Sequence, residues 1–406
     1  MRTGGAQRHG LGAFAVVAAN PATATMPTGT TGADPPRRQR ELRLLLAGDV
    51  MCGRGIDQIL PFPSSPQLFE PFVRDARDYV RLAEQVHGRL PKPVDFTWPW
   101  GDALALFRDP AVALRIVNLE TAITTHDEPW PKGINYRMHP RNLPLLTEAR
   151  IDCAGLANNH VLDWGRKGLL ETLEVLEQAG IRTAGAGRDA AMAAAPAIFP
   201  LAEGGRVLVF AMGHVSAGIP ADWAAGPGRP GVHLLPDLSD RTLATLSHHL
   251  ASHLQPGDLA IASLHWGSNW GFAIPPDHRR FAHGLVALGF HLVHGHSSHH
   301  ARAIECHRGV PILWGCGDFL NDYEGIEGHE GFRGDLALAW LPVFRGPPWR
   351  IERGEVAVFR IRRMRLETAP PADCREIARI LDRESRPLGV RVETAGGHHL
   401  ELHFAG

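Results

Sequence analysis

The sequence predicts an α/β fold that carries its functional residues at the ends of buried strands. Short, continuous apolar runs such as residues 41–47 and 258–264 are typical of strands that are buried on both faces. They alternate with helical patterns such as the one that follows Gly165. Several of the apolar runs end on Asp, Glu, Asn or His, and α/β sheets bind their ligands beyond the carboxyl ends of strands.

The bulk composition excludes several classes of protein. A chain of 406 residues can bury a large core in one or two domains. A formal net charge of −1 provides no electrostatic footprint for nucleic acid or an anionic membrane. No apolar run approaches the roughly 20 residues of a membrane-spanning helix. The five cysteines form no C-x-x-C pair, so we expect free thiols and a cytoplasmic location.

Residues 1–40 are rich in Ala, Thr, Gly and Pro, and we expect a disordered N-terminal extension there. Within this extension, the apolar residues 11–19 and the Ala-Thr-Ala sequence at 22–24 mimic a short signal peptide. Free thiols argue against export, so a signal peptide is the weaker interpretation. The folded part is therefore expected to begin near residue 41.

The rest of the chain is expected to alternate between strands and helices. The expected strands cover residues 41–47, 114–121, 181–184, 206–212, 258–264, 304–306, 310–314 and 336–341, and the expected helices cover residues 75–87, 165–180, 240–254 and 275–288. Residues 185–190 match the dinucleotide-binding pattern G-x-G-x-x-A, but they lack the acidic partner expected about 20 residues later. We interpret them as an ordinary turn from strand to helix. Residues 346–406 suggest a strand, a helix and a strand that pack on the same domain.

The most unusual stretch is residues 291–300, in which half of the side chains are imidazoles. Imidazole is the commonest metal ligand among protein side chains. Gly295 is expected to let the backbone turn tightly, so that His296 and His299 come off a strand end towards one point. The alternative is a polar surface loop with fortuitous metal affinity.

Other strand ends in the sequence carry side chains of the same kind. In chain order these are Asp49, Glu120, Asn159 with His160, His265, and finally His296 with His299. Each follows a hydrophobic run, so the polar groups are expected to emerge from a rigid sheet. Oxygen and nitrogen donors from separate strands are what a hard or borderline divalent cation requires. The pattern therefore predicts a metal centre at the strand ends.

This order of residues resembles that of the calcineurin-like metallophosphoesterases. The exact residues of the motifs resemble those of their CapA branch, the capsule and poly-γ-glutamate synthesis proteins. The resemblance rests on the segments GDVMCGR (48–54), NLE (118–120), LANNHVLDWG (156–165), HWG (265–267), HGHSSH (294–299) and GCGDF (315–319). It implies a sandwich of two β-sheets flanked by helices, with a CapA-like domain over residues 41–345 and the C-terminal extension beyond it.

The resemblance also implies roles for individual residues. The positions that match metal ligands are Asp49, Glu120, Asn159, His265, His296 and His299. They would hold one or two divalent ions per chain, of Mn, Fe, Zn, Mg or Ca. His160 matches the histidine that in phosphoesterases protonates the leaving group or stabilises charge, and Arg54 would face an anionic group of the substrate. Apart from the resemblance, we expect Asp163 and Asp318 to support the metal site from outside its ligands, because metal-bound histidines usually donate their second N–H to a carboxylate or carbonyl. Asp318 is also expected to take part in catalysis.

Three positions depart from the family pattern. Phosphoesterases have Asp-x-His where this chain has Asp49-Val-Met51, so one metal site lacks a nitrogen ligand. Many CapA sequences carry a glutamate soon after His-Trp-Gly, whereas residues 268–270 supply none. Asp318 replaces the usual asparagine of Gly-Asn-Phe and adds a carboxylate. These departures affect the reaction more than the fold.

The expected function is a metal-dependent hydrolase that acts on a phosphoester or on a peptide or poly-γ-glutamate-like polymer. One alternative is a metal-dependent peptide epimerase that removes and returns a Cα proton through Asp and His side chains. The other is a non-catalytic component of a capsule assembly that binds the polymer. For all three functions we expect an anionic or peptide substrate or ligand and no nucleic-acid partner.

Overall fold

The computed structural model describes residues 40–202 and 204–405. The extension predicted for residues 1–40 lies outside the described residues, apart from Arg40 at the start of the first strand. Among the described residues, no helix is both long enough and apolar enough to cross a membrane.

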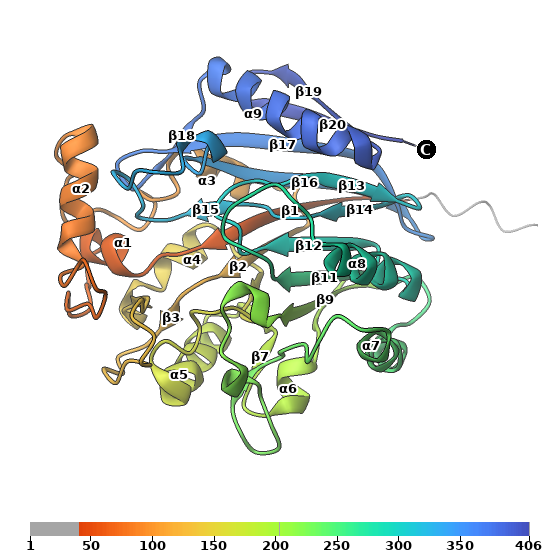
Figure 1. Cartoon of the computed structure of the whole chain (residues 1–406), viewed down its shortest axis with the longest axis horizontal. Helices are drawn as coiled ribbons and strands as arrows, with labels where there is room; N and C mark the ends of the chain where they lie inside the picture. The colour runs from red at the N-terminus through yellow and green to blue at the C-terminus, as the bar shows by residue number, and fades with distance from the viewer. Residues whose placement is uncertain (1–39, 203, 406) are drawn as a thin grey trace, which may run out of the picture. The chain divides into compact units, whose positions relative to one another are not determined.

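Most strands of the described residues belong to two large sheets (Figure 1). The larger sheet contains β1 (Arg40–Val50), β2 (Leu114–Leu119), β5 (Cys153–Gly155), β6 (Arg182–Ala184), β15 (Asp318–Leu320), β16 (Leu336–Gly346), β17 (Arg350–Ile361), β18 (Leu366–Thr368), β19 (Val390–Gly396) and β20 (His399–Phe404). The smaller sheet contains β8 (Ala197–Pro200), β9 (Arg206–Gly213), β11 (Leu259–His265), β12 (Leu292–His296), β13 (Ile304–His307) and β14 (Val310–Leu313). Two short pairs join β3 (Ala122–Ile123) to β4 (Arg137–Met138) and β7 (Ala186–Gly187) to β10 (Gly231–Val232).

Parallel strands form one half of the larger sheet and the centre of the smaller one. The larger sheet has the order β19-β20-β17-β16-β1-β2-β5-β6, with β15 beside β1 and β18 beside β17. Strands β1, β2, β5 and β6 run parallel to one another. The smaller sheet has the order β13-β14-β12-β11-β9-β8, in which β9, β11, β12 and β14 run parallel. The carboxyl ends of the parallel strands of each sheet therefore gather at one edge of that sheet.

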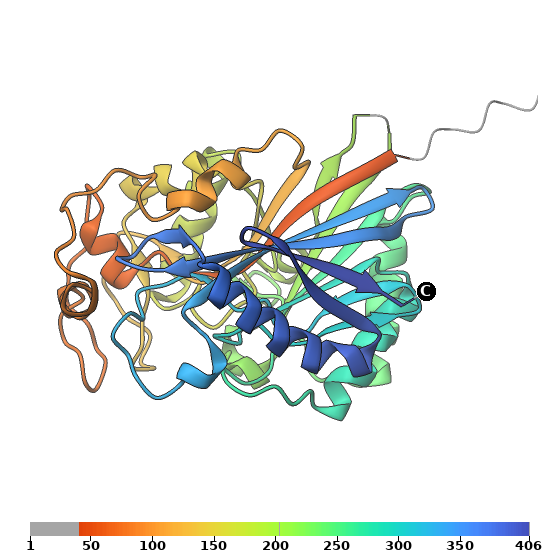
Figure 2. The same ribbon diagram turned by 90° about the horizontal axis from the view of Figure 1, so that it is seen from above.

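Most helices lie on the outer faces of the two sheets, whereas the last helix packs on the core between the sheets. The helices are α1 (Arg54–Ile59), α2 (Arg77–His87), α3 (Leu104–Phe107), α4 (Pro144–Glu148), α5 (Gly165–Gln178), α6 (Ala190–Ala194), α7 (Asp240–His253), α8 (Pro276–Leu288) and α9 (Pro371–Ser385). Several amphipathic helices bury one stripe of apolar residues, as α5 does with Leu169, Leu173 and Leu176. Figure 2 shows α9 beside the strands at the C-terminal end of the chain.

Strand β1 shows how the core is divided. Leu44 and Leu46 point into the cluster of apolar residues between the two sheets, whereas Leu45 and Ala47 point into the cluster beneath the helices of the larger sheet. A third cluster fills the space between the smaller sheet and helices α7 and α8. The order of layers is thus helices, sheet, sheet and helices, which confirms the predicted sandwich of two sheets flanked by helices.

The C-terminal residues continue the larger sheet. Strand β17 pairs with β16 and β20, and α9 contributes Ile377 and Leu381 to the core between the sheets. The sequence suggested one strand on each side of the helix, but the structure has two on each side, β17 and β18 before it and β19 and β20 after it. The extra strands are short or expose every second residue, so their apolar pattern is weak.

Candidate metal centre

The strand ends of both sheets bring the predicted residues together. Asp49 lies near the end of β1, Glu120 directly follows β2, and His265 and His296 end β11 and β12. The register aligns His265 with His296 in the smaller sheet and Asp49 with Asp318 of β15 in the larger one. Backbone pairing therefore fixes where these side chains emerge.

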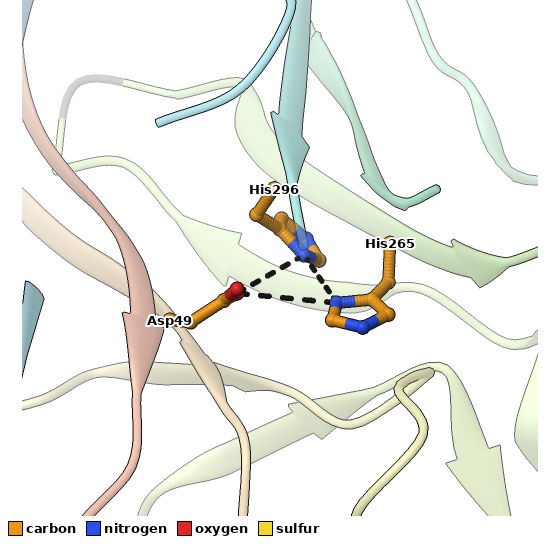
Figure 3. A group of neighbouring side chains, drawn as sticks. All are labelled: Asp49, His265 and His296. Carbon is orange, nitrogen blue, oxygen red and sulfur yellow. Dashed lines mark hydrogen bonds and ion pairs between the residues drawn. The ribbon is translucent and has the colours of Figure 1, made fainter. Parts of the chain in front are cut away.

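The first group of possible ligands consists of Asp49, His265 and His296, whose polar ends point towards one another in Figure 3. The Nδ1 atoms of the two histidines lie 3.0 Å apart. Asp49 Oδ1 lies 3.9 Å from Nδ1 of His265 and 3.6 Å from Nδ1 of His296. All three side chains are buried, and burial lowers the pKa of both histidines well below its usual value. The group thus presents neutral nitrogens and a carboxylate oxygen to one point.

The second group consists of Asp49, Glu120 and Asp318, so Asp49 is shared by both groups. One carboxylate oxygen from each residue lies within 4.8 Å of the others, and all three are buried. Burial and the charge of Asp318 raise the pKa of Asp49 to about 8, and burial and Asp49 raise the pKa of Glu120 well above its usual value. Glu120 Oε2 has no hydrogen-bond partner among the described residues. Crowded, buried carboxylates of this kind are costly without a compensating positive charge.

The donor chemistry of the two groups fits divalent cations. The first group offers two imidazoles and a carboxylate, and the second offers carboxylates alone. Imidazole suits Zn, Fe and similar ions, whereas carboxylate oxygens suit Mg, Ca and Mn. The orphaned Glu120 oxygen and the mutual repulsion of the three acids would both be relieved by a cation between them.

Two groups that the sequence did not identify as functional hold Asp49 in place. Asn118 Nδ2 donates to Asp49 Oδ1 at 2.8 Å, and the backbone N–H of Ser297 donates to Asp49 Oδ2 at 3.0 Å. Ser297 has a φ of 99°, a conformation that non-glycine residues rarely adopt. Asn118 is the first residue of the NLE segment, so the family motif could have identified it as functional. Ser297 gave none, because its contribution comes from the backbone.

Asn159 and His299 lie next to the two groups. Asn159 Oδ1 is 3.0 Å from Nε2 of His265, and Nδ1 of His299 is 3.1 Å from Oδ1 of Asp318. Burial acts to lower the pKa of His299, but Asp318 and Asp49 outweigh it and raise the pKa. Of the six predicted ligands, four thus converge in these groups, and two contact members of them.

His160 is held at the edge of the centre by contacts on two sides. Its Nδ1 lies 2.7 Å from Asp163 Oδ2, and its Nε2 lies 3.9 Å from Glu120 Oε1. The ring of Tyr136 stacks on the imidazole with centroids 3.8 Å apart. Lys132 contacts Asp163 at 2.7 Å and Nδ1 of His160 at 3.2 Å. Burial and the charge of Lys132 lower the pKa of His160 to about 4.

Arg54 makes ion pairs inside the protein. Its Nη1 lies 2.8 Å from Glu70 Oε1, and its Nε and Nη2 lie 2.9 and 2.5 Å from the two carboxylate oxygens of Asp322. Tyr79 covers the guanidinium, with its ring centroid 3.5 Å away. The side chain also lines the cleft above the metal groups. Two carboxylates already balance its charge, so the structure gives it a structural partnership that the sequence did not indicate.

A cleft of about 860 Å³ opens above these groups. Glu120, Asn159, His160 and His299 contribute to its wall, which places the edge of the candidate metal centre at its base. The rest of the wall is largely aromatic and charged and includes Tyr79, Lys132, Tyr136, Trp270, Tyr323, Glu324, His329, Glu330 and Arg333. A cleft of this size accommodates a segment of a polymer or a small phosphoester.

Two further histidines of residues 291–300 are structural. His294 contacts Ala47 O at 3.0 Å and Ser263 Oγ at 3.2 Å between the sheets. His300 is fully buried against the ring of Phe272, 4.9 Å away. The expected tight turn at Gly295 is wrong, because Gly295 lies within β12. A Cβ there would lie 2.5 Å from Leu313 O, so glycine is required for close packing of the strands.

Comparisons with known proteins identify relatives over most of the chain. The family model described as bacterial capsule synthesis protein PGA_cap matches residues 43–323. A probable polyglutamine synthesis accessory protein of Mycobacterium tuberculosis is 47% identical over 361 residues, which cover 88% of this chain and 95% of that protein. The capsule biosynthesis protein CapA of Bacillus anthracis is 23% identical over 287 residues, or 70% of this chain and 61% of its own length. The PGA biosynthesis protein CapA of Bacillus subtilis is 22% identical over 278 residues, or 68% of this chain and 62% of its own length.

Proposed function

The chain belongs to the family of bacterial capsule synthesis proteins described as PGA_cap, and on this premise we propose that it is a metal-dependent hydrolase. Its substrate would be a phosphoester or a peptide polymer of the polyglutamate type. The observation that carries the proposal is the position of Asp49, which is shared by an imidazole-rich and a carboxylate-rich group of ligands. Both groups lie beside His160, a possible proton donor or acceptor at the cleft.

In the proposed hydrolase, metal binding and proton transfer are carried out by different residues. Asp49, Glu120, Asp318, His265 and His296 would hold the cation, with Asn159 and His299 beside them. A divalent cation in this position supplies an activated water and polarises a phosphoryl or carbonyl oxygen.

Proton transfer would fall to His160. The contact between Asp163 and Nδ1 orients the ring and leaves Nε2 on the side of Glu120 and the cleft. From there, Nε2 can exchange a proton with a leaving group held in the cleft. Stacking by Tyr136 keeps the ring in that plane.

A second candidate function is peptide epimerisation, and one specific observation favours it. Two Asp–His pairs line or adjoin the cleft, His160 with Asp163 and His299 with Asp318. An epimerase needs two acid–base groups on opposite faces of one Cα, of which one removes its proton and the other delivers a proton to the opposite face, and these pairs could serve. The third possibility is a non-catalytic accessory role, a term that appears in the name of the mycobacterial relative.

One experiment separates the three functions. The Mn²⁺-loaded protein is incubated in D₂O with bis(p-nitrophenyl) phosphate, γ-glutamyl oligomers and short peptides, and the products are analysed by mass spectrometry. Cleavage that is lost in both Asp49→Ala and His160→Ala, but kept in the exposed control His248→Ala, supports the hydrolase. Deuterium at Cα of an uncleaved peptide would overturn it in favour of the epimerase. Metal and polymer binding without any turnover would establish the accessory role.

A further inference from the structure

A second cluster of metal-binding side chains lies outside the cleft. It contains His283 of α8 and two residues of β13, Glu305 and His307, with one ligand atom from each within 4.8 Å of the others. None of the three lines the cleft above the candidate metal centre. We propose that this α8–β13 cluster is a separate binding site for a divalent transition-metal ion of borderline softness, such as Zn²⁺.

The backbone places the three ligands on one side of the protein. Glu305 and His307 are two residues apart on β13, so their side chains lie on the same face of the strand. His283 reaches them from α8, and its Nε2 lies 2.7 Å from Glu305 Oε1. The imidazoles of His283 and His307 stack with centroids 3.6 Å apart and planes 4° apart. Because a metal ion lies in the plane of each imidazole that binds it, one ring must rotate for both to bind the same ion, and the partly exposed His283 has room to do so. Two nitrogens and one oxygen thus share a small space between a helix and the edge strand of the smaller sheet.

Neighbouring residues prepare Glu305 for coordination. Its carboxylate is 3% exposed, and Trp314 Nε1 donates to Oε2 at 3.2 Å, which leaves Oε1 directed at the histidines. Partners of this kind fix the orientation of metal ligands and raise affinity. Arg279 contacts Oε1 at 3.2 Å, but its side chain is 47% exposed and can withdraw into solvent.

The donor set indicates which ion the cluster would prefer. Two imidazoles and one carboxylate are a frequent ligand set for Zn²⁺, with water in the remaining position. The carboxylate-rich group at the base of the cleft favours harder ions such as Mg²⁺ and Mn²⁺. The partial exposure of His283 gives the ion a route from solvent. A bound ion would join α8 to β13 and stabilise the packing of the helix on the edge of the sheet.

The test counts Zn²⁺ on the full chain. Protein stripped with chelator is dialysed against Zn²⁺ at a few micromolar free ion, and bound metal is measured by plasma mass spectrometry. His307→Ala should hold one equivalent less than the wild type, and its Zn²⁺ affinity at this cluster should fall at least tenfold. The double variant His296→Ala with His307→Ala should lose more metal than either single variant, because the two sites are independent.

Control variants separate loss of the site from loss of the fold. His283→Gln keeps a polar side chain on α8 and should also lose this equivalent, while its circular dichroism without metal matches the wild type. Arg279→Ala removes a competing cation and should bind Zn²⁺ at least as tightly as the wild type. If His307→Ala and His283→Gln both retain the wild-type number of Zn²⁺ ions, the proposed site is wrong.

Discussion

The Nδ1 atoms of His265 and His296 face each other at a distance of 3.0 Å, although both rings are buried and the pKa of each is lowered by burial. Two nitrogens of neutral imidazoles at this distance can share only one proton between them. A cation that binds both nitrogens and Asp49 Oδ1 satisfies all three atoms at once. This pair therefore provides the sharpest test of the candidate metal centre.

Replacing His296 with Ala should remove one nitrogen ligand and weaken Mn²⁺ binding by roughly 100-fold or more, because loss of an outer-shell partner alone costs about 10- to 100-fold. Isothermal titration calorimetry of chelator-treated protein measures the change. The matched control is His248→Ala, an exposed histidine of α7 whose Nδ1 lies 2.8 Å from Ala244 O of the same helix. Equal Mn²⁺ affinity in His296→Ala and the control would exclude His296 as a ligand.

The sequence predicted the strand-end residues well because a buried strand and its polar end are both local features. Asp49 and His265 each follow a continuous apolar run, and the alignment of His265 with His296 in the smaller sheet needed only the rule that parallel strands end at one edge. That the two sheets pack with these edges together came from the family resemblance. The backbone pairing of Asp49 with Asp318 could not be read from either segment alone.

Other parts of the site depend on tertiary contacts that leave no pattern in the sequence. Lys132 and Tyr136 come from the segment between β3 and β4, which has little regular structure, yet both contact His160. Arg54 follows β1 as predicted, but its partners Glu70 and Asp322 lie 16 and 268 residues away. Such long-range pairings form only in the folded core, so they could not be read from the sequence around Arg54. The sequence suggested that Arg54 binds the substrate, but in the structure two carboxylates already occupy its guanidinium.

Asp318 and Asp163 should now behave differently, although the sequence assigned both to a supporting role. Asp318 belongs to the carboxylate group with Asp49, so Asp318→Asn should weaken Mn²⁺ binding by at least roughly 10-fold. Asp163 contacts His160 and Lys132, so Asp163→Asn should leave Mn²⁺ affinity within about twofold and lower kcat by roughly 100-fold or more, because the imidazole that exchanges a proton with the substrate loses its orientation. Calorimetry and turnover measured on the same preparations distinguish the two. Equal loss of metal affinity in both variants would contradict this division.

Arg54 should matter first for stability. Arg54→Ala leaves Glu70 and Asp322 buried without their partner, which typically costs about 3–5 kcal/mol. Urea denaturation gives the free energy of unfolding. The control is Arg77→Ala, whose ion pair with Asp75 is exposed and should contribute less than about 1 kcal/mol. An unchanged free energy of unfolding, together with a raised KM for an anionic substrate, would instead favour direct contact with the substrate.

The buried side chain of His278, which lies outside the candidate metal centre, should make the stability of the protein depend on pH. It lies on α8 with 5% of its surface exposed and stacks on Trp266, with ring centroids 4.6 Å apart. Burial lowers the pKa of His278 to about 4; Asp277 opposes this effect, while His214 and Arg302 add to it. The unfolded chain, with a pKa near 6.5, therefore binds the proton more readily, so the free energy of unfolding falls as the pH drops from 6.5 towards 4.

The neutral variant His278→Gln isolates this contribution, because all other titrating groups remain. Between pH 7 and pH 4.5, the free energy of unfolding of the wild type should fall by about 2 kcal/mol more than that of the variant. Urea denaturation at both pH values measures the two slopes, and the difference between them cancels the shared acid denaturation of the carboxylates. Parallel slopes would mean that His278 accepts its proton in the folded state, either because Asp277 offsets the burial or because the ring reaches water.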